Sequence, residues 1–220
     1  MKLCYNTVTS NLKEYLLRLM SHPAFDKYYL AGGTSLALQL GHRMSVDIDL
    51  FTDELYPSID LSVIKRGLQD LFPHIRNIET LESHSMVQTL FVGDDEGSEI
   101  KLDLCYDEPR FDNLVLTDGL RLASIKEIGA MKMNAIVNGE RRKDYWDVHE
   151  LMTQHTLEEI IDWSLEKYPF SLSREDILNR IASVWDLPDK TEIISLREGI
   201  WEFVADDLCD EAVKLLKKGL

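Results

Sequence analysis

One stretch, residues 29–51, constrains the fold more than any other part of the chain. A short apolar run leads into a Gly-Gly-Thr-Ser turn, an apolar segment follows, and a second apolar run carries two aspartates. Strand side chains alternate with a period of two, so Asp47 and Asp49 would share one face of a strand over residues 46–51. The other face of that strand would carry Val46, Ile48 and Leu50.

Two carboxylates side by side on a strand repel each other. At about 4 Å and an effective dielectric constant near 20, the repulsion is roughly 4 kcal/mol. Either one carboxyl group is protonated or a cation lies between the two, and hard oxygen ligands on a rigid scaffold suit Mg²⁺. The pattern predicts a metal site at Asp47 and Asp49, although Asp-x-Asp alone also fits a solvated strand face.

The Gly-Gly-Thr-Ser turn offers a place for phosphate. Gly32 and Gly33 leave backbone N–H groups uncovered, and such groups suit phosphate oxygens. Residues 34–40 are predicted to form a helix whose positive N-terminal end faces this turn. A lone Gly-Gly pair also fits an ordinary turn. A phosphate cradle followed by a metal site within about 20 residues indicates chemistry on a nucleotide.

Composition narrows the class of protein. The 220 residues allow one large domain or two small ones. A net charge of −15 argues against broad non-specific binding to DNA or to an anionic membrane. No stretch approaches the roughly 20 apolar residues of a membrane span. The three cysteines form neither a zinc pattern nor a disulfide framework, which predicts a reducing, cytoplasmic location.

The periodicity changes near residue 118. Before it, strands are predicted over residues 28–31, 46–51, 75–81, 85–92 and 99–106, and helices over 9–21, 34–40 and 58–71. After it, helices are predicted over residues 122–137, from 144 onward, and over 156–167, 173–184, 191–205 and 208–218. We therefore expect an α+β fold. A mixed sheet flanked by helices would occupy residues 1–118, and an all-helical C-terminal domain over residues 119–220 would complete the active site.

A third carboxylate lies on the strand predicted over residues 99–106. Ile100, Leu102 and Leu104 take one face of this strand, and Lys101, Asp103 and Cys105 take the other. Asp103 would join Asp47 and Asp49 if the two strands are neighbours. On its own, Asp103 also fits an ordinary outward-facing aspartate.

The second half contains the one dense basic cluster of an acidic chain. Arg141, Arg142 and Lys143 precede Asp144, and Lys126 and Lys132 lie on the helix predicted just before them. The cluster is either a solvated loop or a patch for the phosphates of an NTP or an RNA.

Two motifs together resemble the nucleotidyltransferase superfamily, and within it the AbiEii/AbiGii toxin family, which includes the MenT-type toxins. The first motif is Gly32-Gly33-Thr34-Ser35 with Arg43-x-Ser45-x-Asp47-x-Asp49-Leu50-Phe51. The second is Met131-Lys132-x-x-Ala135 followed by Lys143-Asp144-Tyr-Trp-Asp147. The resemblance spans about residues 28–152.

The resemblance implies a nucleotidyltransferase-like mixed sheet flanked by helices, followed by a helical part. It also implies transfer of a nucleoside monophosphate from an NTP, with Mg²⁺ or Mn²⁺ and release of pyrophosphate. In characterised members the acceptor can be the 3′ end of tRNA. A toxin of this family would have a cognate antitoxin as its partner.

The resemblance also assigns roles to residues. Gly32, Gly33, Thr34 and Ser35 would hold the triphosphate, Asp47 and Asp49 would bind the metal ions, and Asp103 would be the third carboxylate. Lys132 would contact the NTP phosphates, and Asp144 would complete the second motif with support from Asp147. Arg43 and Lys126 are further candidates for nucleotide contacts. Many relatives carry an arginine seven residues after the lysine; here that residue is Gly139, so Arg141 or Arg142 would take its place.

Two alternatives to an RNA-modifying toxin remain open. The same chemistry could act on a small molecule, as in aminoglycoside nucleotidyltransferases, because an acidic cleft suits a cationic acceptor. The chain could also be a catalytically degenerate protein that binds a nucleotide, for which Gly139 is the only support.

Overall fold

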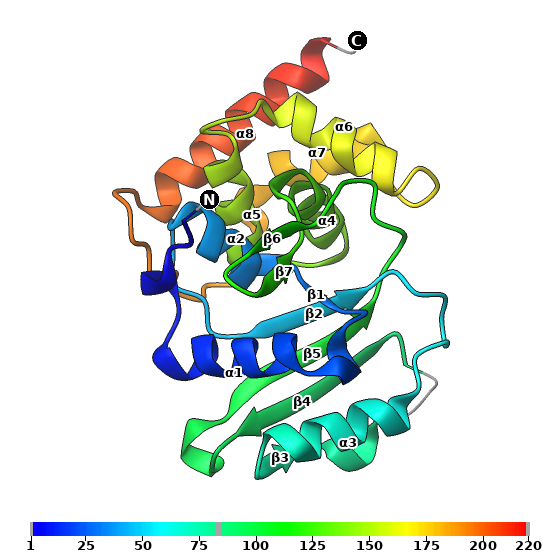
Figure 1. Cartoon of the computed structure of the whole chain (residues 1–220). Helices are drawn as coiled ribbons and strands as arrows, with labels where there is room; N and C mark the ends of the chain where they lie inside the picture. The colour runs from blue at the N-terminus through cyan, green and yellow to red at the C-terminus, as the bar shows by residue number, and fades with distance from the viewer. Residues whose placement is uncertain (1, 82–84, 219–220) are drawn as a thin grey trace. The chain divides into compact units, whose positions relative to one another are not determined.

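The structure is a computed structural model that describes residues 2–81 and 85–218. The chain forms two compact units (Figure 1). The first comprises Met1–Gly41 and Ser45–Ser124, and the second comprises His42–Met44 and Ile125–Leu220. The domain boundary was predicted near residue 118, which is the turn of a β-hairpin. Both strands of this hairpin belong to the first unit, and the second unit resumes at Ile125.

A mixed sheet forms the first unit. Seven strands lie in the described residues, in the order β3-β4-β5-β2-β1-β7-β6. The pairs β2–β5 and β1–β7 are parallel, and the other neighbours are antiparallel. Their bounds are β1 Tyr29–Leu30, β2 Ile48–Thr52, β3 His74–Arg76, β4 Val87–Gly93, β5 Ile100–Tyr106, β6 Val115–Thr117 and β7 Leu120–Leu122. The predicted α+β class is confirmed.

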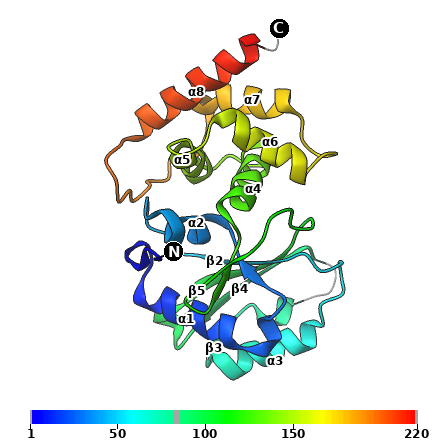
Figure 2. The ribbon, with the colours of Figure 1, turned by 45° about the horizontal axis from the view of Figure 1, so that its top comes forward.

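Two amphipathic helices cover one face of this sheet, α1 (Ser10–Ser21) and α3 (Leu61–Leu71). In both ribbon views they lie on the same side of the strands (Figures 1 and 2). The hydroxyl of Thr9 caps α1 by accepting a hydrogen bond from the Leu12 amide at 3.2 Å, and the carboxylate of Asp60 caps α3. The apolar faces of both helices meet the even-numbered residues of β2, β4 and β5 in one core: Leu12, Leu16, Leu19, Ile64, Leu68, Ile48, Leu50, Leu90, Val92, Leu102 and Leu104, with others.

The strand that carries Asp49 begins later than predicted. β2 starts at Ile48, so Asp47 precedes the strand, and Val46 is 61% exposed rather than packed in the core. The amide of Ser45 donates to the Thr7 carbonyl at 2.8 Å, and the Thr34 hydroxyl donates to the Asp47 carbonyl. The Ser45 amide and the Asp47 carbonyl are therefore bonded to residues outside the sheet, and pairing with β5 starts at Ile48.

The β6–β7 hairpin was not predicted. Asp118 and Gly119 form its turn with φ of 52° and 78°. Two residues with positive φ are typical of the tight hairpin turn that favours Asp-Gly. The dipeptide between Val-Leu-Thr and Leu-Arg-Leu was therefore a readable hairpin signal.

The second unit is helical. Its main helices in the described residues are α4 Ile125–Asn138, α5 Arg142–Leu151, α6 Leu157–Lys167, α7 Arg174–Ala182 and α8 Trp201–Lys218. Thr156 and Glu159 form a reciprocal capping box at the start of α6, and Ser173 caps α7. An ion pair at 2.6 Å between the almost fully buried Glu127 and Lys167 links α4 to α6. None of the helices within the described residues is long and apolar enough to cross a membrane.

Short 3₁₀ helices and one further helix complete the described elements. The 3₁₀ helices are η1 Tyr5–Thr7, η2 Pro23–Phe25, η3 Ile78–Thr80, η4 Glu96–Ser98 and η5 Val184–Asp186. The helix α2 (Gly32–Leu40) follows β1 directly and packs against β2. It begins at Gly32, two residues before the predicted start, so both glycines belong to its first turn.

The two helices predicted over residues 191–205 and 208–218 are wrong. One helix, α8, covers residues 201–218, and residues 191–200 are not helical. The amide of Met44 donates to the Ile194 carbonyl, and the amide of Leu196 donates to the His42 carbonyl, both at 2.9 Å. Arg43 and Ser195 thereby form an antiparallel bridge. This pairing with a distant segment outweighs the local helical pattern.

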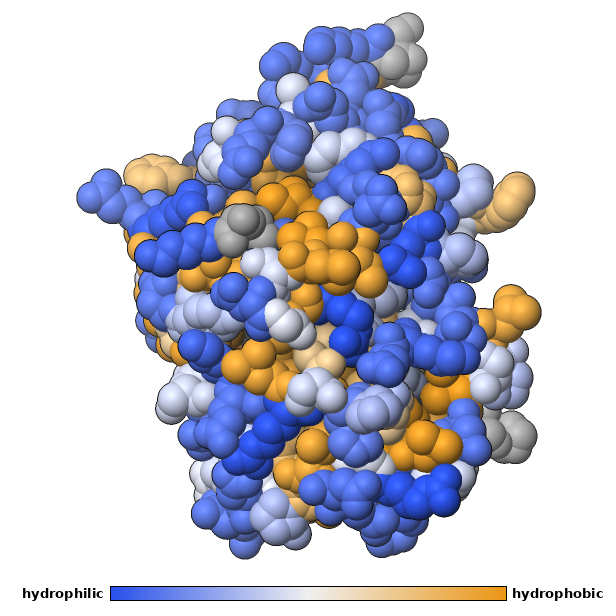
Figure 3. All heavy atoms as spheres, in the orientation of Figure 1, coloured by the Kyte–Doolittle hydropathy of each residue, from blue (hydrophilic) through white to orange (hydrophobic). Residues whose placement is uncertain are grey.

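The surface drawn in Figure 3 is mostly hydrophilic, with hydrophobic side chains in separate groups between the polar ones. This distribution accords with a chain in which 29% of residues are charged.

Candidate active site

Asp49 and Asp103 lie opposite each other on the parallel strands β2 and β5. Thr89 on β4 faces Asp103 in turn, so the three residues form one row across three strands. Neighbouring strands are about 4.8 Å apart. All three side chains are on the sheet face away from the α1–α3 core, and they are partly buried. The predicted adjacency of Asp103 and Asp49 is confirmed.

The carboxylate of Asp103 has two donors. Thr89 Oγ1 donates to one oxygen at 2.7 Å, and Lys101 Nζ donates to the other at 2.5 Å. Burial lowers the pKa of Lys101, but the carboxylates of Asp103, Asp49 and Asp47 raise it by more, so the net shift is upward. Lys101 is therefore a fixed positive charge in the acidic cluster. The sequence placed Lys101 on the face of Asp103 but gave it no role.

Gly32 brings the start of α2 against Asp49. Its φ is +64°, and a Cβ built on it would lie 2.7 Å from Asp49 Oδ2. The helix has no side-chain cap at its N-cap residue, Ala31. A carboxylate beside the first turn of a helix is stabilised by the partial positive charge there. The two predicted elements, the glycine turn and the aspartate strand, thus meet at Gly32 and Asp49.

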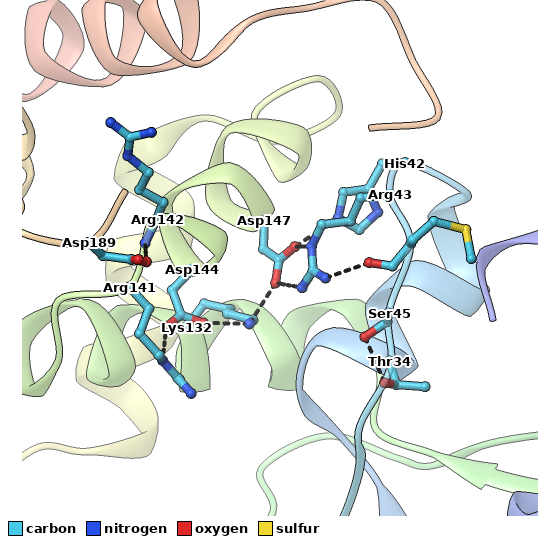
Figure 4. A network of polar contacts seen from close by, with 11 residues as sticks. Thr34, His42, Arg43, Ser45, Lys132, Arg141, Arg142, Asp144, Asp147 and Asp189 are labelled. Atoms are coloured by element: carbon cyan, nitrogen blue, oxygen red, sulfur yellow. Dashed lines mark hydrogen bonds and ion pairs between the residues drawn. The ribbon is translucent and has the colours of Figure 1, made fainter. Parts of the chain in front are cut away.

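Thr34 and Ser35 are fully buried within the first turns of α2. Thr34 Oγ1 lies 2.8 Å from Ser45 Oγ (Figure 4). It also donates to the Asp47 carbonyl. Ser35 Oγ accepts a hydrogen bond from Gln39 Nε2 at 3.2 Å. In this structure both hydroxyls hold the fold around the turn. Their predicted contact with a triphosphate remains a prediction.

The predicted metal ligands are not gathered around one point. No group of three or more His, Cys, Asp or Glu side chains within residues 2–81 and 85–218 is arranged to hold a metal ion. Asp103 instead pairs with Lys101 and Thr89, which offsets the repulsion between neighbouring carboxylates. The donor set still fits Mg²⁺, which nucleotide-dependent enzymes bind through one or two carboxylates together with substrate phosphates. Asp49 and Asp103 provide such a pair in register.

A second polar cluster lies in the helical unit around Asp147 (Figure 4). Lys132 Nζ on α4 lies 2.7 Å from Asp144 Oδ1 and 2.6 Å from Asp147 Oδ2, both on α5. The guanidinium of Arg43 donates to both oxygens of Asp147, at 2.6 and 2.8 Å. His42 Nε2 is 2.8 Å from the same carboxylate. All five side chains are at most about 6% exposed.

This cluster keeps its charges. Burial raises the pKa of Asp147, but Arg43 and Lys132 outweigh that effect and hold the pKa well below its usual range. Burial lowers the pKa of Lys132, but Asp144 and Asp147 outweigh it and leave the pKa raised. Asp147 is therefore ionised and Lys132 protonated at neutral pH. We expect a rigid network, because leaving any member unpaired in a buried site is costly.

Of the other basic residues predicted to contact the nucleotide, Arg141, Arg142 and Lys126, one joins the cluster around Asp147 and two do not. Arg141 Nε donates to Asp144 Oδ2 at 2.8 Å, with a side chain that is 56% exposed, so Arg141 belongs to the second cluster. Arg142 does not, because its side chain points away from Lys132 and Asp144 (Figure 4). Lys126 pairs with Glu166 at 3.2 Å on another part of the unit.

The backbone around Gly139 leaves no room for a side chain. A Cβ on Gly139 would lie 2.8 Å from the backbone oxygen of Ala135, so no side chain fits there without a backbone shift. Arg180 donates to the carbonyls of Ile136 and Gly139 at the end of α4. Of the two proposed substitutes for the family arginine, only Arg141 reaches the lysine–aspartate cluster.

Sequence reasoning missed His42 and the partner of Arg43. The sequence motifs assign no role to His42, yet its side chain is fully buried against Asp147. The only local signal was its position next to Arg43, because the contact joins residues more than 100 positions apart.

Comparison with known proteins decides the family. The family model described as "Nucleotidyl transferase AbiEii toxin, Type IV TA system" matches residues 14–180. The chain belongs to the AbiEii toxin family. The family predicted from the two motifs is thus confirmed, and with it the assignment to nucleotidyltransferases. The match extends beyond both motifs, into α7.

Individual relatives are distant. An uncharacterised protein of Aquifex aeolicus, aq_aa25, is 27% identical over 197 residues, covering 79% of this chain and 88% of its own. A crystal structure of a candidate nucleotidyltransferase from Helicobacter pylori superposes with a TM-score of 0.57 at 20% identity, covering 94% of this chain and 92% of that one. JHP933 from Helicobacter pylori gives 0.56 at 21% identity, covering 94% and 90%. These two structures show that the AbiEii-family chain shares their fold.

Proposed function

We propose that this AbiEii-family protein is a Mg²⁺-dependent enzyme that transfers a nucleoside monophosphate from an NTP to the 3′ end of an RNA, with tRNA as the leading acceptor. It would act in the cytoplasm as the toxin of a toxin–antitoxin system. The observation that carries the proposal is the row of Asp49 and Asp103 across β2 and β5, with Asp49 against Gly32 at the start of α2. In this proposal, the residues that would bind the metal lie next to the helix terminus that would bind phosphate.

Each part of this row has a task in the proposal. Asp49 and Asp103, with Asp47 just before β2, would hold Mg²⁺. When bound, the metal would neutralise phosphate charge and lower the pKa of the acceptor hydroxyl. The first turn of α2 would bind triphosphate oxygens through its backbone N–H groups. Lys101 would keep the Asp103 carboxylate in place at 2.5 Å until the substrates arrive.

The helical unit would supply positive charge. Lys132 stays protonated between Asp144 and Asp147, and Arg141 extends from Asp144 with more than half of its side chain exposed. We propose that Arg141 contacts the NTP phosphates in place of the arginine that Gly139 replaces. Phosphoryl transfer needs charge neutralisation and positioning more than a protein nucleophile, and the cluster contains both kinds of charge in fixed positions.

The direct test is a transfer assay. Purified protein is incubated with each α-labelled NTP, MgCl₂ and total tRNA, and labelled RNA is resolved on a gel. We expect label at the RNA 3′ end, and Asp49→Asn should reduce it by at least about 100-fold. Asp70→Asn is the matched control, because the Asp70 side chain is 72% exposed on α3. Equal labelling by both variants would refute the assignment.

The same assay distinguishes the alternatives. Label on an aminoglycoside but not on tRNA would favour a small-molecule acceptor, in line with the net charge of −15. NTP binding without labelling or pyrophosphate release would favour a degenerate nucleotide-binding protein.

A further inference from the structure

The helical unit contains a pocket that none of the proposed catalytic steps uses. It has a volume of about 220 Å³ and is lined by Arg142, Trp146, Glu192, Ser195, Gly199 and Trp201, with neighbouring residues. Pockets for drug-sized ligands start at roughly 300 Å³. This pocket therefore suits a single ring system rather than a whole nucleotide.

Three flat groups contribute to the pocket lining, those of Arg142, Trp146 and Trp201. The guanidinium carbon of Arg142 lies 4.6 Å from the centroid of the Trp201 ring, so the cation stacks on the indole. Trp146 is buried as a residue, with 8% of its surface exposed. Gly199 has a φ of +146°, and a Cβ built there would lie 3.9 Å from Trp146 Cη2, so a side chain at this position would contact the ring edge. Indole and guanidinium planes are the surfaces on which unpaired bases stack.

Both kinds of hydrogen-bonding group are present. Arg142 lines the pocket, and its guanidinium carries only N–H donors. Glu192 adds a carboxylate acceptor to the lining. The edge of a nucleobase carries both acceptors, which Arg142 requires, and donors, which Glu192 requires. A hydrocarbon would satisfy neither group, and a simple anion would be repelled by Glu192.

The helix α5 separates this pocket from the lysine–aspartate cluster. Arg142 and Trp146 are four residues apart and share one face of α5, whereas Asp144 and Asp147 share another. Figure 4 shows Arg142 directed away from Lys132 and Asp144. The Arg142 amide donates to Asp189 Oδ2 at 2.8 Å, which fixes the first turn of α5 beside the pocket. A ligand here would thus be distinct from the NTP phosphates assigned to Arg141 and Lys132.

We propose that this pocket stacks one unpaired base of the RNA acceptor, between Trp146, Trp201 and the Arg142 guanidinium. The proposal rests on the proposed function, since it assigns the acceptor strand to a second face of α5. It also revises the role of Arg142: the residue contacts the acceptor base rather than the NTP.

The test measures RNA and NTP binding separately on the full-length protein. Fluorescein-labelled single-stranded hexaribonucleotides ending in each of the four bases are titrated by anisotropy. A non-hydrolysable NTP with MgCl₂ is titrated by calorimetry. Because base stacking contributes about 1–3 kcal/mol, Trp201→Ala should weaken hexamer binding roughly 5- to 150-fold and leave the NTP Kd unchanged. Arg142→Lys keeps the positive charge but removes the planar guanidinium, so it should also weaken hexamer binding.

Trp185→Ala is the matched control. Trp185 is 46% exposed in the same unit and does not line the pocket, so this variant should bind the hexamers as the wild type does. Circular dichroism melts verify that each variant folds.

Four outcomes would overturn the inference. The wild type could bind no hexamer, or Trp201→Ala could leave the hexamer affinity unchanged. Trp201→Ala could also weaken NTP binding alone, or it could abolish self-association of the protein while the RNA affinity stays the same. The transfer assay with Asp49→Asn is independent of these results. The pocket assignment can therefore fail while the proposed transfer activity stands.

Discussion

Gly32 meets two separate requirements at the start of α2. Its φ of +64° is strained for other residues, and its missing Cβ leaves room for the Asp49 carboxylate. Gly32→Ala would place a methyl group 2.7 Å from the present position of Asp49 Oδ2. We therefore expect transfer activity per folded molecule to fall by at least about 10-fold, since sub-ångström positioning errors are costly in catalysis. The gel assay with labelled NTP measures this loss.

Gly41→Ala is the matched control for that variant. Gly41 ends the same helix with a φ of +73°, and a Cβ there would meet Cys4 Sγ at 2.9 Å, with no carboxylate among the atoms within 4 Å. Both variants should lower the melting temperature, but only Gly32→Ala should lose transfer activity. Equal activity losses in the two variants would show that α2 stability, not the Gly32–Asp49 contact, limits the reaction.

Residues differ in how far the sequence reveals their setting. Asp49 and Asp103 were predictable, because strand alternation fixes the face on which each side chain lies. The setting of Lys132 was predictable only in part. The second motif grouped Lys132 with Asp144 and Asp147, but no local pattern places Arg43 on Asp147, which is 104 positions away. His42 shows the same limit, since its partner lies 105 positions away.

The hairpin β6–β7 provides a test at the scale of one element. Gly119 has a φ of +78° and no atom within 4 Å of a built Cβ, so its replacement costs only backbone conformation. Gly119→Ala should lower the free energy of unfolding by about 1 kcal/mol, because the left-handed conformation disfavours a Cβ by that amount. Urea unfolding followed by circular dichroism gives the value.

Gly97→Ala is the control, because it makes the same substitution at a glycine without a positive φ. Gly97 has no positive φ, and its built Cβ lies 3.4 Å from the Asp95 carboxylate, which is ordinary contact. This variant should be as stable as the wild type or slightly more so. A loss for Gly97→Ala equal to that for Gly119→Ala would contradict the turn assignment.

At this scale, elements with a complete local signal were predicted and those fixed by tertiary pairing were not. The helices α1, α3, α6 and α7 follow their periodicity to within a few residues, because their apolar stripes and caps agree. The segment 191–200 has helix-compatible residues, yet its backbone pairs with His42 and Met44. Sequence periodicity does not contain that competition.

For the molecule as a whole, acidic groups outnumber basic ones. The chain has 39 Asp and Glu residues but only 24 Lys and Arg residues, and its isoelectric point is about 4.8. Repulsion among the excess carboxylates should weaken the folded state at neutral pH and fade as the pH approaches the isoelectric point. Buried or paired carboxylates act in the opposite sense, so the two effects compete between pH 7 and pH 3.

Each unit contains a paired carboxylate whose pKa is depressed. In the first, Arg76 and His74 lower the pKa of Glu99 to about 2. In the second, the pKa of Asp147 is well below its usual range; burial works against this shift, and Arg43 and Lys132 cause it. A folded-state pKa below the unfolded value means that the stabilisation is fully present above about pH 4. It is lost as the pH falls through the folded-state pKa.

Asp147→Asn tests which of these effects governs acid unfolding. In the wild type, the free energy of unfolding should stay level or rise from pH 7 to about pH 5, and then fall steeply below about pH 4. The variant should be about 3 kcal/mol less stable at pH 7, because Arg43 and Lys132 lose a buried partner. Its gap to the wild type should narrow as the wild-type carboxylate becomes protonated. Urea titrations at pH 7, 5, 4 and 3 measure both curves, with the exposed Asp210→Asn as control. Parallel curves for Asp147→Asn and wild type across this range would mean that the excess surface charge, and not the Asp147 cluster, controls the acid limit of the fold.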